Sequence, residues 1–298
     1  MGGSGKTPVV AALARLLRQH GEQPVILTRG YGRREVTEGV LVVSDGQCLL
    51  EPVERSGDEP QMLARMLPGV PVLVGADRYL AGVFADRHFA ATVSILDDGF
   101  QHVQLERDVD LLLVSVDDLS DRVVPAGHLR EPLAAAHLAE AVLVSGSEVD
   151  VTAVAEALKH PTIFRVKTNY EAVVHRGPDQ ARPAVGPVVA FAGIARPERF
   201  FNALRALGYE VARELTFPDH HWYTAADIAR IQAAAHDTNA TLIVTTEKDA
   251  VRCELECAVL PMTVTLEPSA EFDEWLMRGL RTRDSEDVSP KPRRGEGG

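Results

Sequence analysis

The chain opens with MGGSGKT, and Gly5, Lys6 and Thr7 form the G-K-[ST] ending of a phosphate-binding P-loop. In such a loop, backbone N–H groups and a helix N-terminus face phosphate oxygens, the lysine adds positive charge, and the hydroxyl reaches a magnesium ion. The amphipathic stretch PVVAALARLLRQHG follows at once, which favours a real nucleotide site over a tail that contains G-K-T by chance. The predicted nucleotide-binding residues are Gly2, Gly3, Ser4, Gly5, Lys6 and Thr7.

A second candidate is the stretch TVSILDDGFQH, in which an apolar run ends in two consecutive aspartates, Asp97 and Asp98. A carboxylate at the end of a buried strand is the usual magnesium-binding element of a P-loop enzyme. Adjacent carboxylates repel each other unless a cation lies between them, which favours a metal site. The alternative is a strand followed by an ordinary Asp-Asp-Gly turn.

Two further stretches carry groups suited to phosphoryl transfer. In RSGDEPQML, Asp58 precedes a predicted helix, where it can cap the helix or act as the general base for an attacking hydroxyl. In VVPAGHLREP, Arg130 can face phosphate and Glu131 can face the metal, with a surface ion pair as the alternative.

The stretch LTFPDHHWY places Asp219, His220 and His221 in a loop before a helix that Thr224 is expected to cap. A histidine oriented by Asp219 would be able to assist proton transfer, and a structural or solvated histidine is the alternative. Neighbouring histidines seldom bind one ion together, which argues against zinc.

An arginine-rich loop, TRGYGRR, follows the apolar run PVILT. Arg29, Arg33 and Arg34, with glycines that allow close backbone approach, are candidates for holding an anionic substrate beyond the carboxyl end of a strand. Arg78 in GADRYLAG is a further candidate. A solvated loop is the alternative.

The elements that must position these residues alternate between short apolar runs and helical patterns. The runs at 24–28, 92–96, 110–116 and 141–146 are apolar without alternation, which is typical of buried parallel strands. We therefore predict an α/β fold: a doubly wound, mainly parallel sheet like that of P-loop NTPases, with a second, smaller α/β domain. The expected units are a nucleotide- and metal-binding kinase domain at 1–150, a β-hairpin connector at 151–186, the smaller domain at 187–280, and a disordered tail at 281–298.

Composition narrows the class of protein. The 298 residues carry a formal net charge of −12, which argues against a nucleic-acid surface, since that needs a basic stripe. The three cysteines are too few and too scattered for a disulfide framework, and Cys253 with Cys257 lacks a second pair of zinc ligands. No apolar run approaches the ~18 residues that indicate a membrane span.

Taken together, the motifs resemble the tetraacyldisaccharide 4′-kinase (lipid A 4′-kinase) family. The resemblance rests on eight stretches that occur in this order along nearly the whole chain: GGSGKTPVV, TRGYG, GDEP, DDGFQH, VPAGHLREP, FAGIARPERFF, FPDHH and TTEKDAV. Each is weak alone, and the set is hard to assign to another family. Members carry several tens of residues ahead of the P-loop, including a membrane-associated helix and the first core strand, and we expect this chain to lack both.

The resemblance implies an ATP- and Mg²⁺-dependent transfer of phosphate to the 4′-hydroxyl of a tetraacylated disaccharide 1-phosphate. It implies that Asp58 is the general base, supported by His220, and that Arg130 faces the β- and γ-phosphates. The implied metal-binding residues are Thr7, Asp97, Asp98 and Glu131. The implied surroundings are an anionic glycolipid at the cytoplasmic face of the bacterial inner membrane, with no nucleic acid and no obligate protein partner.

Two other functions stay open on the sequence. A P-loop NTPase that acts as a switch or metallochaperone would share the nucleotide motifs and would use the D-H-H stretch and the cysteines for metal. An inactive remnant or interaction module would bind no nucleotide.

Overall fold

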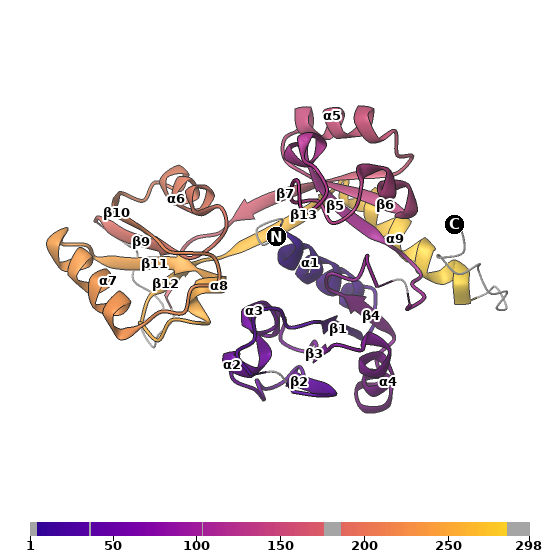
Figure 1. The fold of residues 1–298 in the computed structure, drawn as a ribbon, viewed down its shortest axis with the longest axis horizontal. Helices are drawn as coiled ribbons and strands as arrows, with labels where there is room; N and C mark the ends of the chain where they lie inside the picture. The colour runs from indigo at the N-terminus through magenta and orange to yellow at the C-terminus, as the bar shows by residue number, and fades with distance from the viewer. Residues whose placement is uncertain (1–4, 36, 103, 176–185, 285–298) are drawn as a thin grey trace.

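The computed structural model describes residues 5–35, 37–102, 104–175 and 186–284, which form three sheets surrounded by helices (Figure 1). Within this part of the chain, no helix is both long enough and apolar enough to span a bilayer.

The first sheet has the strand order β2-β3-β1-β4. Its strands are β1 (Pro24–Thr28), β2 (Val40–Ser44), β3 (Val72–Gly75) and β4 (Val93–Leu96). β1 pairs in parallel with β3 and β4, whereas β2 is antiparallel to β3. All five residues of β1 are buried, as its continuous apolar run predicts for a central parallel strand. The neighbouring helices are α2 (Val53–Ser56), α3 (Asp58–Met66) and α4 (Arg78–Phe89).

The second sheet has the order β13-β7-β6-β5. It contains β5 (Leu111–Ser115), β6 (Ala141–Ser145), β7 (Ile163–Tyr170) and β13 (Met262–Glu267), with β13 antiparallel to β7 and the other pairs parallel. Around it lie α5 (Glu148–Leu158), α9 (Ser269–Asp284) and two 3-10 helices, Val116–Ser120 and Leu133–Leu138.

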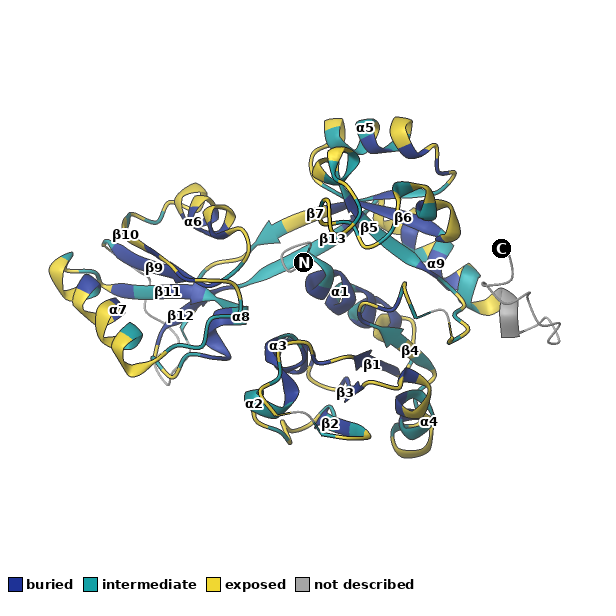
Figure 2. Cartoon of the chain, viewed as in Figure 1, coloured by how far each residue is buried: buried dark blue, intermediate teal, exposed yellow. Residues whose placement is uncertain are grey.

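Helix α1 (Lys6–Gln19) connects the first two sheets, and Figure 2 shows it buried along most of its length. Val9 and Leu13 pack into the core of the second sheet, whereas Val10 and Ala14 pack into the core of the first. Among the described residues, β4 and β5 form no ladder with each other, so α1 joins two half-sheets rather than covering one continuous sheet.

The third sheet forms a separate unit with the order β10-β9-β11-β12-β8. Its strands are β8 (Val174–His175), β9 (Val188–Ala192), β10 (Val211–Thr216), β11 (Leu242–Thr246) and β12 (Ala258–Leu260). Helices α6 (Pro197–Ala206), α7 (Ala225–Asp237) and α8 (Glu247–Ala250) accompany it. β7 and β13 extend between this unit and the second sheet (Figure 1).

The predicted hairpin in the 151–186 connector is wrong. The segment begins inside α5, β7 pairs with β6 and β13, and β8 pairs with β12 in a different sheet. The chain also returns from the third sheet through β13 and α9, so the last part of the predicted 187–280 unit packs on the second sheet. Local apolar pattern indicates a strand but carries no information about its distant partner. The predicted tail begins within α9, and residues 285–298 lie outside the described part.

Candidate active site

The P-loop residues that the structure describes start helix α1. Gly5 is the N-cap with φ of 79°, a left-handed conformation that glycine adopts without the strain a side chain would add. Lys6 begins the helix and Thr7 is buried. The predicted residues Gly2, Gly3 and Ser4 lie outside the described residues.

The structure brings the P-loop lysine to the carboxylates that follow β4. Lys6 Nζ lies 2.6 Å from Asp98 Oδ1, although the two residues are 92 positions apart. Arg130 donates to the other carboxylate oxygen of Asp98. Burial alone would raise the pKa of Asp98, but the hydrogen bonds and charges of Lys6 and Arg130 lower it below its ordinary value. The carboxyl end of β4 and the N-terminus of α1 therefore form one site.

Asp97 lies deeper than Asp98, and in the part of the chain that the structure describes it forms no ion pair with a basic side chain. It is 4% exposed, and Thr28 Oγ1 at the end of β1 donates to its Oδ2 at 3.2 Å. Burial, followed by the charge of Glu59, raises the pKa of Asp97 to about 6. A buried carboxylate with a raised pKa beside a second carboxylate fits a cation site.

This chemistry suits magnesium. Mg²⁺ is held by one or two carboxylates together with phosphate oxygens and water, so it does not need a cage of protein ligands. Accordingly, the described residues contain no cluster of three His, Cys, Asp or Glu side chains that would hold a metal alone. Glu131 is partly exposed and directly follows Arg130, which contacts Asp98.

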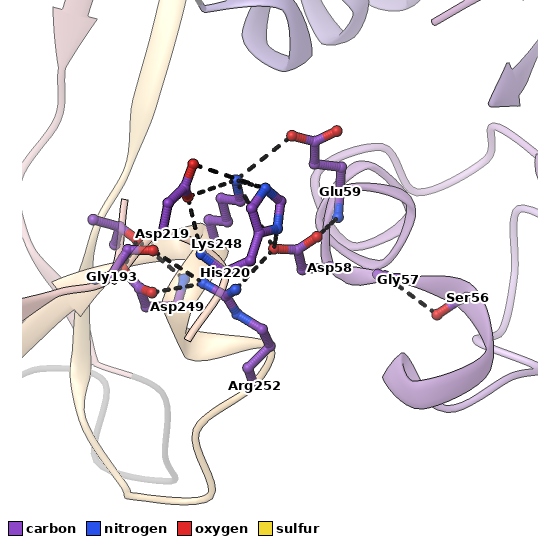
Figure 3. Close-up of polar contacts among 11 residues, drawn as sticks. Ser56, Gly57, Asp58, Glu59, Gly193, Asp219, His220, Lys248, Asp249 and Arg252 are labelled. Carbon is purple, nitrogen blue, oxygen red and sulfur yellow. Dashed lines mark hydrogen bonds and ion pairs between the residues drawn. The ribbon is translucent and has the colours of Figure 1, made fainter. Parts of the chain in front are cut away.

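A second cluster lies where α3 meets the third-sheet unit (Figure 3). Asp58 is the first residue of α3 and is 3% exposed. His220, in the loop after β10, places Nδ1 2.9 Å from Asp58 Oδ2. These are the residues predicted as base and supporting histidine, and the two units each contribute one of them. The charge of Glu59, which adjoins Asp58, raises the pKa of Asp97, so this edge of the cluster lies near the carboxylates after β4.

Two basic residues from α8 and the turn after it complete the cluster. Lys248 Nζ lies 3.1 Å from His220 Nε2, and Arg252 Nη1 lies 3.1 Å from Asp58 Oδ2 (Figure 3). Burial would raise the pKa of Asp58, but the hydrogen bond from His220 and the charges of Lys248 and Arg252 lower it overall. Asp58 is thus held as an anion, as a general base must be.

Sequence reasoning missed Lys248 and Arg252 as site residues. The TTEKDAV stretch supports the family resemblance, and its position also supplies a usable signal, since Lys248 lies two residues after β11 at the carboxyl end of a parallel strand. The sequence predicts that Asp219 orients the histidine, but its Oδ2 lies 3.9 Å from His220 Nε2. The close contacts with the ring come from Asp58 and Lys248 instead.

His221, the second histidine of the LTFPDHHWY stretch, has a structural role. His221 Nε2 lies 3.0 Å from Asp227, whose carboxylate also accepts from the N-cap Thr224 of α7. Cys253 and Cys257 belong to the apolar core of the third-sheet unit. The metallochaperone alternative expects the D-H-H stretch and the cysteines to bind metal. In the described residues, His221 instead contacts Asp227, and the two cysteines pack in the core.

The predicted anion-binding arginines divide between the two clusters. Arg78 is buried and donates to Gly75 O at 2.9 Å, and its pKa is lowered first by burial and then by the nearby charge of Arg29. Arg33 is partly buried beside Gly57, so it lies next to Asp58. Arg78 lies near Arg29 and the Asp97–Asp98 carboxylates, whose charges act on it, and we call Arg29, Arg33 and Arg78 the basic border.

The arginine loop also contacts the third-sheet unit. The guanidinium of Arg34 lies 4.1 Å from the ring centre of Trp222, a cation–π contact. The exposed ring of Tyr31 meets the His220 ring edge-on at 5.9 Å. The loop after β1 therefore touches the loop that carries His220.

Comparison with known proteins agrees with this geometry. The family model for tetraacyldisaccharide-1-P 4′-kinase (LpxK) matches residues 1–281. The chain belongs to the tetraacyldisaccharide 4′-kinase family. A tetraacyldisaccharide 4′-kinase of Desulfotalea psychrophila is 38% identical over 93% of this chain and 84% of its own length. One from Koribacter versatilis is 44% identical over 84% of this chain and 74% of its own length.

A solved structure gives the same result at the level of the fold. It is described as the "apo" form of LpxK from Aquifex aeolicus in complex with ATP, and it is 31% identical to this chain. The TM-score is 0.74, with 94% of this chain and 85% of that chain covered. Family membership confirms the predicted P-loop-like α/β class and a phosphotransferase that uses ATP.

Proposed function

We propose that this chain transfers the γ-phosphate of ATP to the 4′-hydroxyl of tetraacyldisaccharide 1-phosphate, and that Asp58 is the general base. The observation that carries the proposal is the meeting of two sites. Lys6 and Asp98 join the P-loop to the end of β4, and Glu59, which adjoins Asp58 of the Asp58–His220 pair, lies near enough to Asp97 for its charge to raise the pKa of that carboxyl.

At the nucleotide end, the backbone of Gly5 and the ammonium of Lys6 bind phosphate at the N-terminus of α1. Thr7, Asp97, Asp98 and Glu131 are the residues that would hold Mg²⁺. When bound, the ion neutralises phosphate charge and orients the transferring group. Lys6 and Arg130, which pair with Asp98 in this structure, are then free to contact phosphate oxygens.

At the acceptor end, Asp58 takes the proton of the attacking hydroxyl as its oxygen bonds to the γ-phosphorus and ADP leaves. His220 holds Oδ2 in place by its hydrogen bond, and Oδ1, which accepts one hydrogen bond from Glu59 N, has a second lone pair to receive the proton. The low exposure of Asp58 excludes water from the base, so that proton transfer to bulk solvent does not compete with transfer from substrate.

The basic border supplies recognition of the acceptor. Arg29, Arg33 and Arg78 lie beside the two carboxylate clusters and, in this proposal, bind the phosphate that the disaccharide already carries. Guanidinium groups suit this role because they donate two parallel hydrogen bonds to phosphate. The substrate is a glycolipid, and we place the reaction at the cytoplasmic face of the inner membrane, where such a lipid would be reached peripherally.

The direct test uses radiolabelled ATP, Mg²⁺ and tetraacyldisaccharide 1-phosphate in detergent micelles, with labelled lipid separated by chromatography. We expect labelled lipid with the wild-type chain and a loss of at least about 100-fold with Asp58→Asn, the usual size of a general-base effect. Asp86→Asn makes the same chemical change on the exposed side of α4 and serves as the matched control. Nucleotide binding without labelled lipid, beside an active positive-control kinase, would instead favour an NTPase switch.

A further inference from the structure

The ammonium of Lys248 is surrounded by acidic groups from two units of the fold. Its Nζ lies 3.3 Å from Asp219 Oδ1, 3.6 Å from Glu59 Oε1 and 3.9 Å from Asp58 Oδ2. The Lys248 side chain is 13% exposed. With three carboxylates around it and little water, Lys248 is held as a cation at one position (Figure 3).

The contacts of His220 settle where its proton lies. An ammonium group has only donors, so the 3.1 Å contact with Lys248 requires Nε2 to accept. An ionised carboxylate has only acceptors, so the 2.9 Å contact with Asp58 requires Nδ1 to donate. Both contacts are satisfied only by a neutral ring that carries its proton on Nδ1. A doubly protonated ring would direct an N–H at the ammonium.

The two charged groups closest to the ring support the same assignment, and the third lies beyond hydrogen-bond distance. Asp58 from α3 lies at Nδ1, and Lys248 from α8 lies at Nε2, while Asp219 stays 3.9 Å from Nε2. The Tyr31 ring covers one side edge-on. Arg252 also contacts Asp58 but not the ring, so its charge acts on the carboxylate alone.

We propose that Lys248 is a positioning residue for catalysis, which fixes His220 in the neutral Nδ1–H tautomer so that the histidine orients the Asp58 carboxylate and does not protonate it. Without the ammonium, the ring is free to adopt the Nε2–H tautomer, which turns a lone pair toward the carboxylate, or to take a second proton. In the first case the carboxylate loses the hydrogen bond that orients it. In the second case it is paired with an imidazolium, which makes it a weaker base. The base would then be misplaced or weakened.

The spectroscopic test measures the tautomer directly and does not depend on kinase activity. Nitrogen-15 NMR of histidine-labelled protein distinguishes a protonated ring nitrogen from an unprotonated one, and His220→Gln identifies the signals. At pH 8 we expect the wild-type ring to carry its proton on Nδ1, and Lys248→Met to show a substantial population with Nε2 protonated. A wild-type ring protonated on Nε2 overturns the inference, even if no variant folds.

The kinetic test rests on the proposed function and uses Lys248→Met, Lys248→Arg and Lys167→Met. Lys167, on β7, has a side chain 52% exposed and ion-paired only at 3.6 Å to Glu267, so it is the matched control. We expect Lys248→Met to lower kcat at least about 10-fold, with the KM for ATP within about twofold, because the defect lies in proton transfer. Lys248→Arg keeps a donor-only group and should restore most of the loss.

The outcomes separate the two proposals. If Lys248→Met keeps wild-type kcat, or keeps the wild-type tautomer, the positioning role is wrong while the kinase assignment stands. If the wild-type chain labels no lipid but the tautomer shifts as expected, the kinase assignment fails and the Lys248 contact stands. A fall in kcat that Lys248→Arg does not restore, without a tautomer change, indicates a merely structural contact and also overturns the inference.

Discussion

Replacing Asp97 by asparagine should stabilise the nucleotide-free protein while abolishing its use of Mg²⁺. Burial raises the pKa of Asp97 to about 6 from an ordinary value of 3.8. Each pKa unit corresponds to about 1.4 kcal/mol, so keeping this carboxylate ionised at pH 8 costs on the order of 3 kcal/mol of folding free energy. Asparagine has nearly the same shape, carries no charge and still accepts the hydrogen bond from Thr28.

The sign of the pH dependence follows from proton binding. Between about pH 4 and pH 6 the folded state binds more protons than the unfolded state, so wild-type stability falls as the pH rises through this window. Urea unfolding of both proteins should therefore show Asp97→Asn more stable by about 3 kcal/mol at pH 8 and by only about 1 kcal/mol near pH 4.5. Asp86→Asn, an exposed change of the same kind, should show neither difference.

Addition of Mg·ATP should reverse the order of stability, so that the wild-type protein becomes more stable than Asp97→Asn. A ligand that binds only the folded state stabilises it by mass action, and the wild-type carboxylate can take part in that binding whereas the amide cannot replace its charge. We expect wild-type protein to gain stability with Mg·ATP and Asp97→Asn to gain little. An Asp97→Asn protein that is less stable than wild type at pH 8 without nucleotide, or equally stable at all pH values, would refute the view that this buried charge is retained for metal binding.

Three further outcomes are expected. Lys6→Ala should raise the Kd for ATP at least about 10-fold in equilibrium binding, because it removes a charge from the phosphate site; unchanged affinity would contradict the P-loop assignment. Asp58→Ala and His220→Ala should each lower kcat while the KM for ATP stays within about threefold, since both act on the acceptor hydroxyl; steady-state kinetics with ATP varied measure this. Arg252→Met should lower the free energy of unfolding by about 3–5 kcal/mol, because it removes the cation that lies 2.8 Å from the buried Asp249 carboxylate and 3.1 Å from that of Asp58. A loss below about 1 kcal/mol in urea unfolding would show that Arg252, 1% exposed, is not needed for their neutralisation.

Much of the first unit was predictable from local sequence. The apolar run that became β1 lacks alternation, which indicated burial on both faces, and all five of its residues are buried. The same pattern predicts a buried strand at 92–96, but in β4 Ser94 is exposed and the other three residues are only partly buried. The carboxylates after β4 lie where the motif placed them. The contact of Lys6 with Asp98 followed from a rule of topology, since a P-loop and the strand ends beside it face one crevice. In these segments the chemistry is encoded within a few neighbouring residues.

The parts that could not be predicted depend on contacts between distant segments. β13 resembles any short apolar strand, and nothing local indicates that it pairs with β7 rather than joining the third sheet. Lys248 becomes a site residue only because the third-sheet unit places α8 against α3. His220 illustrates the same limit: its nearest acidic neighbour in sequence is Asp219, but its close partner is Asp58, 162 positions away.

The antiparallel pair β7–β13 connects the third-sheet unit to the rest of the molecule and determines how the two parts can move relative to each other. From Lys167 to Tyr170, β7 pairs with β13 after its ladder with β6 has ended, so this stretch is a two-stranded ribbon. Such a ribbon keeps its length because its peptide bonds are rigid, but it twists more readily than a broad sheet. Twisting of this ribbon would separate Asp58 from His220 while leaving the hydrophobic cores on both sides intact. Such a separation would open the site and allow a bulky acylated product to leave after each turnover. Stiffening the ribbon should therefore slow release of the product more than transfer of the phosphate.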